Sequence, residues 1–199
     1  MTDRSPTTAA EHARGLDRRS VLGLGLGATG LALTAGGPEA IAASTRGLSN
    51  EDVLALYRLK ANYAFGTDAI GAGDFDRGLA LYRQVFAPNA QIAAGFDEAA
   101  PALEAVGPDA YAELVRGAVV GTLGSQHFLG TFGVEAGPGR RGASITAYFQ
   151  ATVLAAADKT ITTYLGAYHD EARRRGRRWL ITKSFAKYLS IEASARTAP

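Results

Sequence analysis

The sequence predicts an α+β domain in which helices come first and a sheet follows. Between residues 49 and 119, apolar residues recur at helical spacing in three segments. From residue 126 onward, long runs of β-branched and aromatic residues are separated by short turns. This order of elements is typical of α+β domains with an antiparallel sheet. We therefore expect one face of the sheet to pack on the helices.

The first helix is expected to begin after Ser49, because Ser49 and Asp52 have the spacing of a capping box. The glycines at residues 71 and 73 should end it, and Asp74 is the expected N-cap of a second helix. A third helix is expected from Pro108, since proline favours the first helical position. The apolar stripe of the first helix is predicted to contain Val53, Tyr57, Ala61, Ala64 and Phe65.

The segment between the second and third helices carries turn signals and little periodicity. Pro88 and Asn89 predict a turn, and residues 90–94 predict a short strand. Residues 95–107 predict an irregular loop, in which Phe96 is a candidate for covering a pocket.

Four long strands are predicted in the C-terminal half, over residues 126–135, 143–154, 160–172 and 179–191. Turns are expected at residues 137–139 and 156–159. Five arginines within residues 173–178 surround Gly176 between the last two strands. Such a cluster can bind nucleic acid or membranes. We favour a solvated hairpin turn, because no aromatic residue is interleaved with the arginines.

The first 42 residues have the pattern of a signal peptide. Arg18 and Arg19 precede an apolar run over residues 21–35, and Ala40-Ile41-Ala42 is a small-x-small cleavage sequence. The paired arginines indicate a twin-arginine signal. A membrane anchor is the alternative, but the run of about 15 residues is short for a span. We expect export and a mature domain over residues 43–199.

Composition argues against several classes of function. The formal net charge is +2, so no strong field favours nucleic acid, and no apolar run after residue 42 suits a membrane span. The absence of cysteine excludes disulfides and thiolate metal sites. With His12 in the predicted signal, only His127 and His169 remain, so we expect no zinc site. No phosphate-binding glycine loop lies outside the signal, and we expect no cofactor.

His127 and Asp68 are the candidate catalytic residues. Asp68 falls on the predicted apolar stripe and near the helix C-terminus, where two independent effects disfavour a carboxylate. Either a partner compensates for these costs, or Asp68 lies exposed at a frayed helix end. Strand alternation places His127, Leu129 and Thr131 on one face, and Gln126, Phe128 and Phe132 on the other. A histidine bonded only to the backbone is the alternative for His127.

His169 alternates with Tyr168, so these two side chains should face opposite sides of the sheet. We interpret His169, Asp170 and Glu171 as a solvated strand end.

The chain resembles the SnoaL-like branch of the nuclear transport factor 2-like superfamily. The resemblance covers roughly residues 48–191 and rests on the Gly73-Asp74-Phe75-Asp76 turn between helices, residues 86–90, residues 126–130 and Trp179. It implies a cone-shaped, curved antiparallel sheet whose N-terminal helices close an apolar cavity. The family includes polyketide cyclases, scytalone dehydratases and relatives of steroid isomerases.

The family implies a role for His127, which falls on the pocket histidine of the scytalone dehydratases. The Tyr-Asp pair of those enzymes is replaced here by Ile70-Gly71, and a pocket tyrosine by Ala94. A second pocket histidine is replaced by Phe149 or Ala155. Their activity is therefore not transferred to this chain.

Three functions remain open after this comparison. The first is a cofactor-free lyase, isomerase or cyclase that acts on a small apolar carbonyl compound through His127 and Asp68. The others are a non-catalytic module that binds an apolar ligand and a dimerisation module. The family also implies a homodimer formed through the sheet. The residues expected to line the cavity and contact the substrate are Tyr63, Phe96, Leu129, Tyr148, Tyr164 and Tyr168.

Overall fold

The computed structural model describes residues 47–137 and 141–195. The signal peptide predicted over residues 1–42 lies outside the described residues, as do residues 138 and 139 of one predicted turn. Among the helices of the described part, none combines the length and the apolar character that a bilayer span requires.

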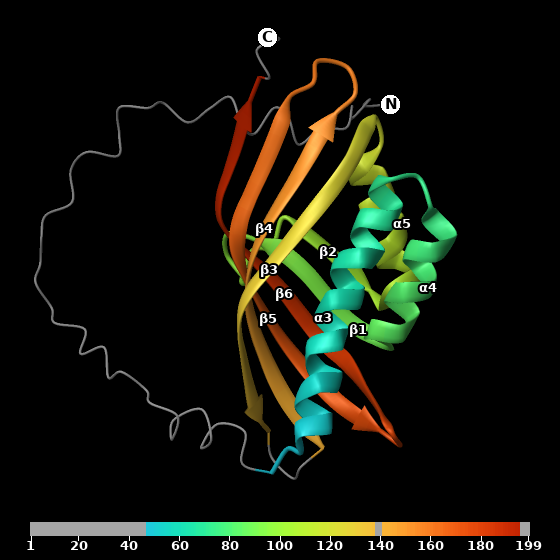
Figure 1. Cartoon of the computed structure of the whole chain (residues 1–199), viewed down its shortest axis with the longest axis vertical. Helices are drawn as coiled ribbons and strands as arrows, with labels where there is room; N and C mark the ends of the chain where they lie inside the picture. Colours follow the sequence, from blue (N-terminus) through green and yellow to red (C-terminus); the bar gives the residue numbers. More distant parts are fainter. Residues whose placement is uncertain (1–46, 138–140, 196–199) are drawn as a thin grey trace, which may run out of the picture. The chain divides into compact units, whose positions relative to one another are not determined.

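The described part contains three helices and one six-stranded sheet, as the α+β prediction requires (Figure 1). The strands lie in the order β2-β1-β6-β5-β4-β3, and the sheet curves around the helices on one side. The elements are α3 (Asn50–Gly71), α4 (Phe75–Val85), β1 (Phe86–Gly95), β2 (Leu103–Val106), α5 (Gly107–Val119), β3 (Thr122–Ala136), β4 (Gly142–Ala155), β5 (Ile161–Arg175) and β6 (Arg178–Ser194).

The sheet is mixed, which corrects the expectation that all its strands are antiparallel. β1 runs parallel to β6, while the other neighbouring strands are antiparallel. A parallel pair needs a long connection, and here β2, α5 and three further strands lie between the two partners in the chain. Local patterns do not report such a distant pairing.

Both predicted helix caps are present. The Ser49 hydroxyl accepts a hydrogen bond from the Asp52 N–H, and the Asp52 carboxylate accepts one from the Ser49 N–H. This reciprocal pair is the expected capping box. At α4, the Asp74 carboxylate accepts a hydrogen bond from the Arg77 N–H. The Asp74 cap lies in the short turn between α3 and α4, and these two helices pack against each other.

The predicted apolar stripe of α3 is wrong. Of its five members only Ala64 is buried, and Phe65 is 59% exposed. The face that packs on the sheet instead contains Leu56, Leu59 and Tyr63 together with polar residues. Because Asp52, Lys60 and Thr67 are also buried on it, this face has no continuous apolar periodicity to detect.

The segment between α4 and α5 is more regular than predicted. Pro88 and Asn89 lie within β1 instead of forming a turn, and residues 103–106 of the predicted loop form β2. The pairing of β1 with β6 is irregular between Phe86 and Gln91. Pro88, which has no N–H to donate, falls within this irregular stretch.

A bulge in β3 changes which side chains share a face with His127. The pairing with β4 shifts between Gly130 and Phe132, and Thr131 adopts a left-handed φ of 47°. The extra residue reverses the alternation beyond it. Phe132 therefore lies on the His127 face and packs on Tyr57 of α3, while Thr131 is exposed, contrary to the prediction.

Aromatic rings fill the centre of the space between the helices and the sheet. Tyr63 lies 5.1 Å from Tyr168 and 5.9 Å from Tyr82, measured between ring centroids. Tyr111 and Phe86 pack at similar distances in the same cluster. Apolar burial of this extent is the main contribution to the stability of the domain.

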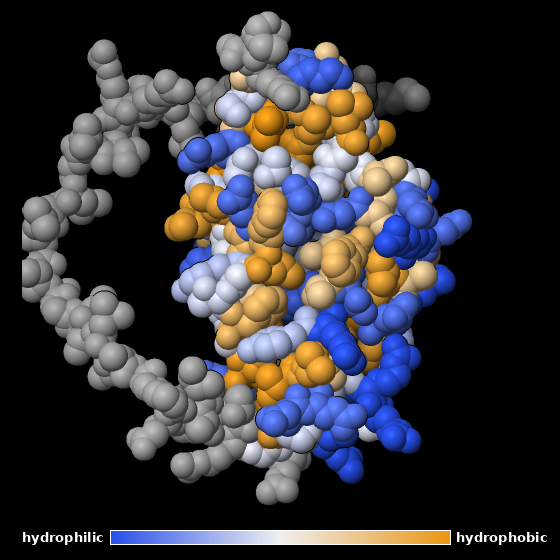
Figure 2. Space-filling model, viewed as in Figure 1, coloured by the Kyte–Doolittle hydropathy of each residue, from blue (hydrophilic) through white to orange (hydrophobic). Residues whose placement is uncertain are grey.

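The arginine-rich segment forms the predicted hairpin turn, with Gly176 and Arg177 at its tip. Arg174 pairs with Asp52 at 3.2 Å, which ties the hairpin to the start of α3. Figure 2 shows hydrophilic residues gathered near the lower end of the molecule, where β5 ends in Figure 1. Elsewhere on this face, apolar and hydrophilic residues are interspersed.

Candidate functional site

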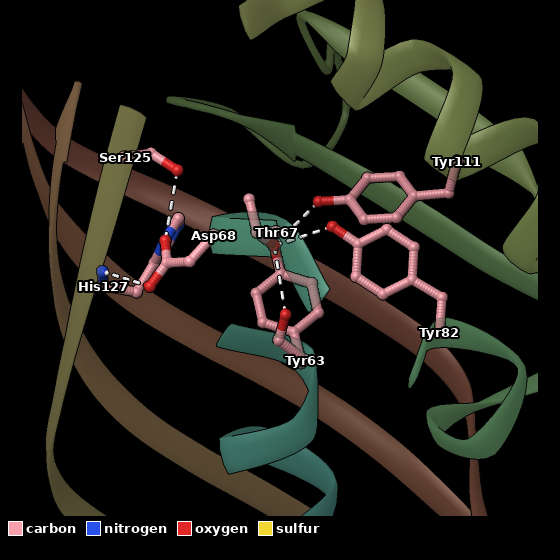
Figure 3. Close-up of polar contacts among 7 residues, drawn as sticks. All are labelled: Tyr63, Thr67, Asp68, Tyr82, Tyr111, Ser125 and His127. Atoms are coloured by element: carbon pink, nitrogen blue, oxygen red, sulfur yellow. Dashed lines mark hydrogen bonds and ion pairs between the residues drawn. The ribbon is translucent and has the colours of Figure 1, made fainter. Parts of the chain in front are cut away.

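Asp68 and His127 meet where the last turns of α3 approach β3 (Figure 3). The His127 Nδ1 atom lies 2.7 Å from the Asp68 Oδ1 atom. The His127 backbone N–H donates to Asp68 Oδ2 at 3.1 Å, and the Ser125 hydroxyl donates to Asp68 Oδ1 at 3.1 Å. The expected contact between the two candidate residues is therefore present.

These donors offset the cost of an acid near a helix C-terminus. The partial negative charge of the last helical turn disfavours Asp68. Three donors from one strand supply the compensation, and the Asp68 side chain is 25% exposed. The alternative of an idle carboxylate at a frayed end does not describe this geometry.

The contact determines which imidazole nitrogen is free. With the carboxylate as acceptor, the His127 Nδ1 atom carries the proton that forms the bond, and the Nε2 atom keeps its lone pair. A carboxylate in this position also stabilises the imidazolium ion. The His127 side chain is only 8% exposed, so the pair is largely shielded from bulk water. Such an arrangement can accept a proton from a bound molecule.

A network of tyrosine hydroxyls lies beside the pair. The Tyr63 ring lies 6.4 Å from the His127 ring, and the Tyr63 and Tyr111 hydroxyls share a hydrogen bond of 2.7 Å. The Tyr82 hydroxyl shares one of 2.7 Å with Thr67, next to Asp68 in the chain. Burial raises the pKa of Tyr63, Tyr82 and Tyr111 well above the usual value for tyrosine. These hydroxyls therefore stay protonated and do not act as bases, and in the Tyr63–Tyr111 bond one of them donates and the other accepts.

The structure brings four of the six expected substrate-binding residues to the His127 side of the sheet. Besides Tyr63, they are Leu129, Tyr164 and Tyr168, all on the inner face. Tyr164 is aligned with His127 through Ala151 of β4, and burial raises the pKa of its hydroxyl. Tyr168 is buried against Phe149, 4.4 Å between ring centroids, so it is part of the core.

The other two expected residues lie elsewhere. Tyr148 is 58% exposed on the outer face of β4, because it alternates with the inward-facing Phe149. Phe96 is also exposed, and its ring lies 5.8 Å from that of Tyr188. Burial raises the pKa of Tyr188 to about 12. The structure therefore does not bring Tyr148 to His127, and it places Phe96 beside Tyr188.

Sequence reasoning missed a buried ion pair. Lys60 Nζ lies 3.0 Å from Asp170 Oδ2, and both side chains are fully buried. The Ser184 hydroxyl donates to the other Asp170 oxygen at 2.6 Å. The interpretation of Asp170 as part of a solvated strand end is wrong, whereas His169 is exposed as expected. Asp170 follows Tyr168 by two residues on the same strand, and residues two apart face the same side of a sheet. The expected inward position of Tyr168 could therefore have predicted that Asp170 also faces inward.

Ser125 is a second residue that the sequence did not single out. It precedes His127 by two residues, and because side chains alternate along a strand it lies on the same inner face of β3.

In the described part of the chain, no group of three His, Cys, Asp or Glu side chains is placed to hold a metal ion.

Two hollows among the described residues lie away from His127. One, of about 200 Å³, lies between the start of α3 and the β5–β6 hairpin and includes Asp52, Arg174 and Trp179. The other is bordered by β1, β2 and β6.

Comparison with known proteins identifies the family. Residues 49–184 match the family described as the SnoaL-like domain, and the chain therefore belongs to it, within the nuclear transport factor 2-like superfamily. No match was found among curated proteins.

Solved structures have the same fold. A candidate scytalone dehydratase from Novosphingobium aromaticivorans superposes with a TM-score of 0.59 at 16% identity, over 74% of this chain and 91% of the other. A candidate aromatic ring hydroxylase from the same organism gives 0.60 at 25% identity, over 74% and 96%. The hexachlorocyclohexane dehydrochlorinase LinA-type3 from Novosphingobium barchaimii gives 0.61 at 14% identity, over 75% and 95%.

Proposed function

We propose that this protein is a cofactor-independent lyase or isomerase for a small apolar carbonyl compound, with His127 as the general base. The observation that carries the proposal is the 2.7 Å contact between His127 Nδ1 and Asp68 Oδ1. It leaves Nε2 as the proton acceptor and places a carboxylate behind the imidazolium ion that forms.

The proposed step is the removal of a proton from the carbon next to the carbonyl group. His127 Nε2 takes the proton, and the electron pair of the broken C–H bond moves into the new C=C bond. In an elimination, the group on the next carbon leaves with its own bonding pair. In an isomerisation of a β,γ-unsaturated carbonyl compound, the carbonyl π pair moves onto the oxygen as the C=C bond forms, which gives a dienolate. The oxygen pair then re-forms the carbonyl group, the C=C bonds shift, and the γ-carbon takes the proton back from the imidazolium ion.

The surroundings of His127 support a small, mostly apolar substrate. Leu129 and Tyr164 lie on the same inner face and are partly buried. Tyr63 and Tyr111 share a hydrogen bond in which one hydroxyl donates and the other accepts, and the proton of the accepting hydroxyl suits a carbonyl oxygen.

The names of related structures add qualified support. A dehydratase and a dehydrochlorinase both perform eliminations, whereas a hydroxylase does not. With identities of 14–16% for the two eliminating proteins, the likeness concerns the fold.

We also propose that the protein is exported, on the basis of the twin-arginine pattern at residues 18–19.

A binding protein without turnover is the second candidate. It is favoured by the low exposure of the His127 side chain, 8%, and by the aromatic rings that fill the centre of the domain. In this case His127 is a polar contact for an apolar ligand.

Hydrogen–deuterium exchange distinguishes the two candidates. The full chain is incubated in D₂O with a panel of small apolar ketones and enones, and deuterium at the α-carbon is followed by NMR. Proton abstraction gives exchange even where no group leaves. We expect His127→Ala to lower the exchange rate by about 10²–10⁴-fold and Asp68→Asn to lower it less.

His169→Ala is the matched control, because His169 is exposed on the opposite face. Exchange that persists at the wild-type rate in His127→Ala contradicts the proposed function. Saturable binding of a compound from the panel, with no exchange in any of the compounds, favours a binding protein without turnover.

A further inference from the structure

We infer that Ser125 is a positioning residue, and that Gly71 gives it access to Asp68. Together they hold the carboxylate so that His127 keeps its proton on Nδ1. The consequence for catalysis rests on the proposed function, whereas the effect on the imidazole does not.

Asp68 Oδ1 is shared between two donors. It receives His127 Nδ1 at 2.7 Å and the Ser125 hydroxyl at 3.1 Å. Oδ2 receives the His127 backbone N–H at 3.1 Å. The two bonds from His127 hold one edge of the carboxylate, and the Ser125 bond prevents rotation about the bond to the carboxyl carbon. Because the Asp68 side chain is 25% exposed, water competes for any oxygen that is released.

The spacing on each element matches this task. Ser125 and His127 are two residues apart on β3, so both side chains point toward α3 (Figure 3). Asp68 and Gly71 are three residues apart on α3, so both lie toward the same side of the helix. The end of the helix is thereby placed against the strand at two points.

Gly71 is required by this close approach. A Cβ atom built on Gly71 would collide with the Ser125 hydroxyl and would lie 3.2 Å from the Ser125 backbone nitrogen. A larger residue here must either turn the Ser125 hydroxyl away from Asp68 or push the end of α3 away from β3. The neighbouring Gly73 is different, because a Cβ built there meets nothing, and its positive φ of 88° belongs to the turn.

The position of the imidazole proton separates a positioning role from a merely structural one. A serine that only packs or stabilises the strand leaves the His127 tautomer unchanged when it is replaced. A serine that fixes the carboxylate changes the tautomer, because a less constrained Asp68 no longer selects the proton on Nδ1.

The test is long-range ¹H–¹⁵N NMR of the histidine side chains in the full chain, with the exposed His169 as an internal reference. We compare the wild type with Ser125→Ala, Ser125→Thr and Gly71→Ala. Ser144→Ala is the control, since Ser144 is exposed on β4. Circular dichroism checks that each variant is folded.

We expect the wild type and Ser144→Ala to hold the His127 proton on Nδ1. Ser125→Ala and Gly71→Ala should give a mixture of tautomers, and Ser125→Thr, which keeps a hydroxyl, should restore the Nδ1 form. In the exchange assay, Ser125→Ala should lower the maximal rate by roughly 10- to 100-fold with little change in KM, as expected for a misplaced catalytic group.

Each outcome decides the inference. An unchanged Nδ1 tautomer in Ser125→Ala overturns it, and so does a threonine variant that behaves like the alanine variant. If Ser125→Ala does not fold, Gly71→Ala provides the same reading of the tautomer. A changed tautomer in a chain that exchanges no substrate proton upholds the positioning role and counts against the proposed function, so the two failures are distinguishable.

Discussion

Replacing one partner of the buried Lys60–Asp170 pair tests how α3 is held against the sheet. Lys60→Met removes the ammonium group and leaves the Asp170 carboxylate buried, with only the Ser184 hydroxyl as a donor among the described residues. Breaking a buried pair in this way typically costs about 3–5 kcal/mol. The variant also loses the cation–π contacts of the Lys60 ammonium group, which lies 3.6 Å from the centroid of the Tyr168 ring and 4.3 Å from that of the Tyr63 ring.

The magnitude can be read from thermal unfolding. For a domain of this size, about 1 kcal/mol corresponds to roughly 2–4 °C in Tm, so Lys60→Met should lower Tm by about 6–20 °C. The double variant Lys60→Met with Asp170→Asn removes both charges and keeps an acceptor for Ser184. Replacing both partners of a buried pair is often neutral, and we expect this variant to recover most of the loss.

The geometry of the pair also predicts a pH dependence. The Nζ–Oδ2 distance of 3.0 Å is that of an ion pair, but neither atom has a well-aligned hydrogen-bond partner among the described residues. Burial lowers the pKa of Lys60, although the Asp170 charge opposes the change. In the window between the lowered pKa and 10.5, the folded state binds fewer protons at Lys60 than the unfolded state does. This contribution to stability therefore rises with pH across that window.

Chemical denaturation of the wild type, both single variants and the double variant, at neutral pH and near pH 10, measures these quantities. The Lys60→Met variant should lack the rise at alkaline pH. A cost below about 1 kcal/mol for Lys60→Met, or a double variant as unstable as the sum of the single ones, refutes the reasoning.

Three further predictions concern other parts of the chain. The hydrogen bonds from the Trp179 indole and from Ser49 lower the pKa of Asp52 below 3.8, although burial opposes them. The stabilisation by Asp52 is therefore present above that pH and is lost as the pH falls through the lower folded-state pKa. At pH 7, Asp52→Asn should therefore have a lower free energy of unfolding than the wild type, and this difference should narrow below pH 3.8. A difference that does not change with pH contradicts this prediction. Replacing both arginines at residues 18 and 19 with lysine should keep the protein in the cytoplasm, whereas normal export of this variant rejects the twin-arginine signal. We expect a homodimer by light scattering at high micromolar concentration, and Tyr148→Glu on the exposed outer face should weaken it, whereas a monomeric wild type excludes the dimer.

Local signals were sufficient for much of the fold. The cap at Ser49, the cap at Asp74 and the long strands of the C-terminal half depend on residues close together in the chain, and the structure has them. The parallel pairing of β1 with β6 depends on residues far apart, and the periodicity of either strand does not contain it.

The same distinction applies to the candidate site. Asp68 was singled out because a carboxylate near a helix C-terminus is unfavourable. The position of a residue within its helix depends on the neighbouring sequence, so this signal could be read locally. The partner His127 was singled out as one of the few histidines, in a predicted strand, and the family resemblance then assigned it to the pocket. The bulge at Thr131 reverses the side-chain alternation of β3, and alternation alone gave Phe132 the wrong face. Lys60 was missed because apolar periodicity assigns charged residues to solvent, yet here the partner Asp170 is supplied by a distant strand.

Two polar contacts of α3 connect stability with the candidate site. Lys60 binds Asp170 on β5, and Asp68, eight residues later and about 12 Å along the helix, binds His127 on β3. A helix attached to two strands by polar groups cannot slide by one turn without leaving both groups unpaired. The apolar contacts of the same face are less demanding, since many side chains can repack. The ion pair, together with the contacts of Asp52 to Arg174 and Trp179, therefore holds the register that brings Asp68 to His127. It follows that the double variant of Lys60 and Asp170 can regain stability and still lose part of the Nδ1 tautomer of His127.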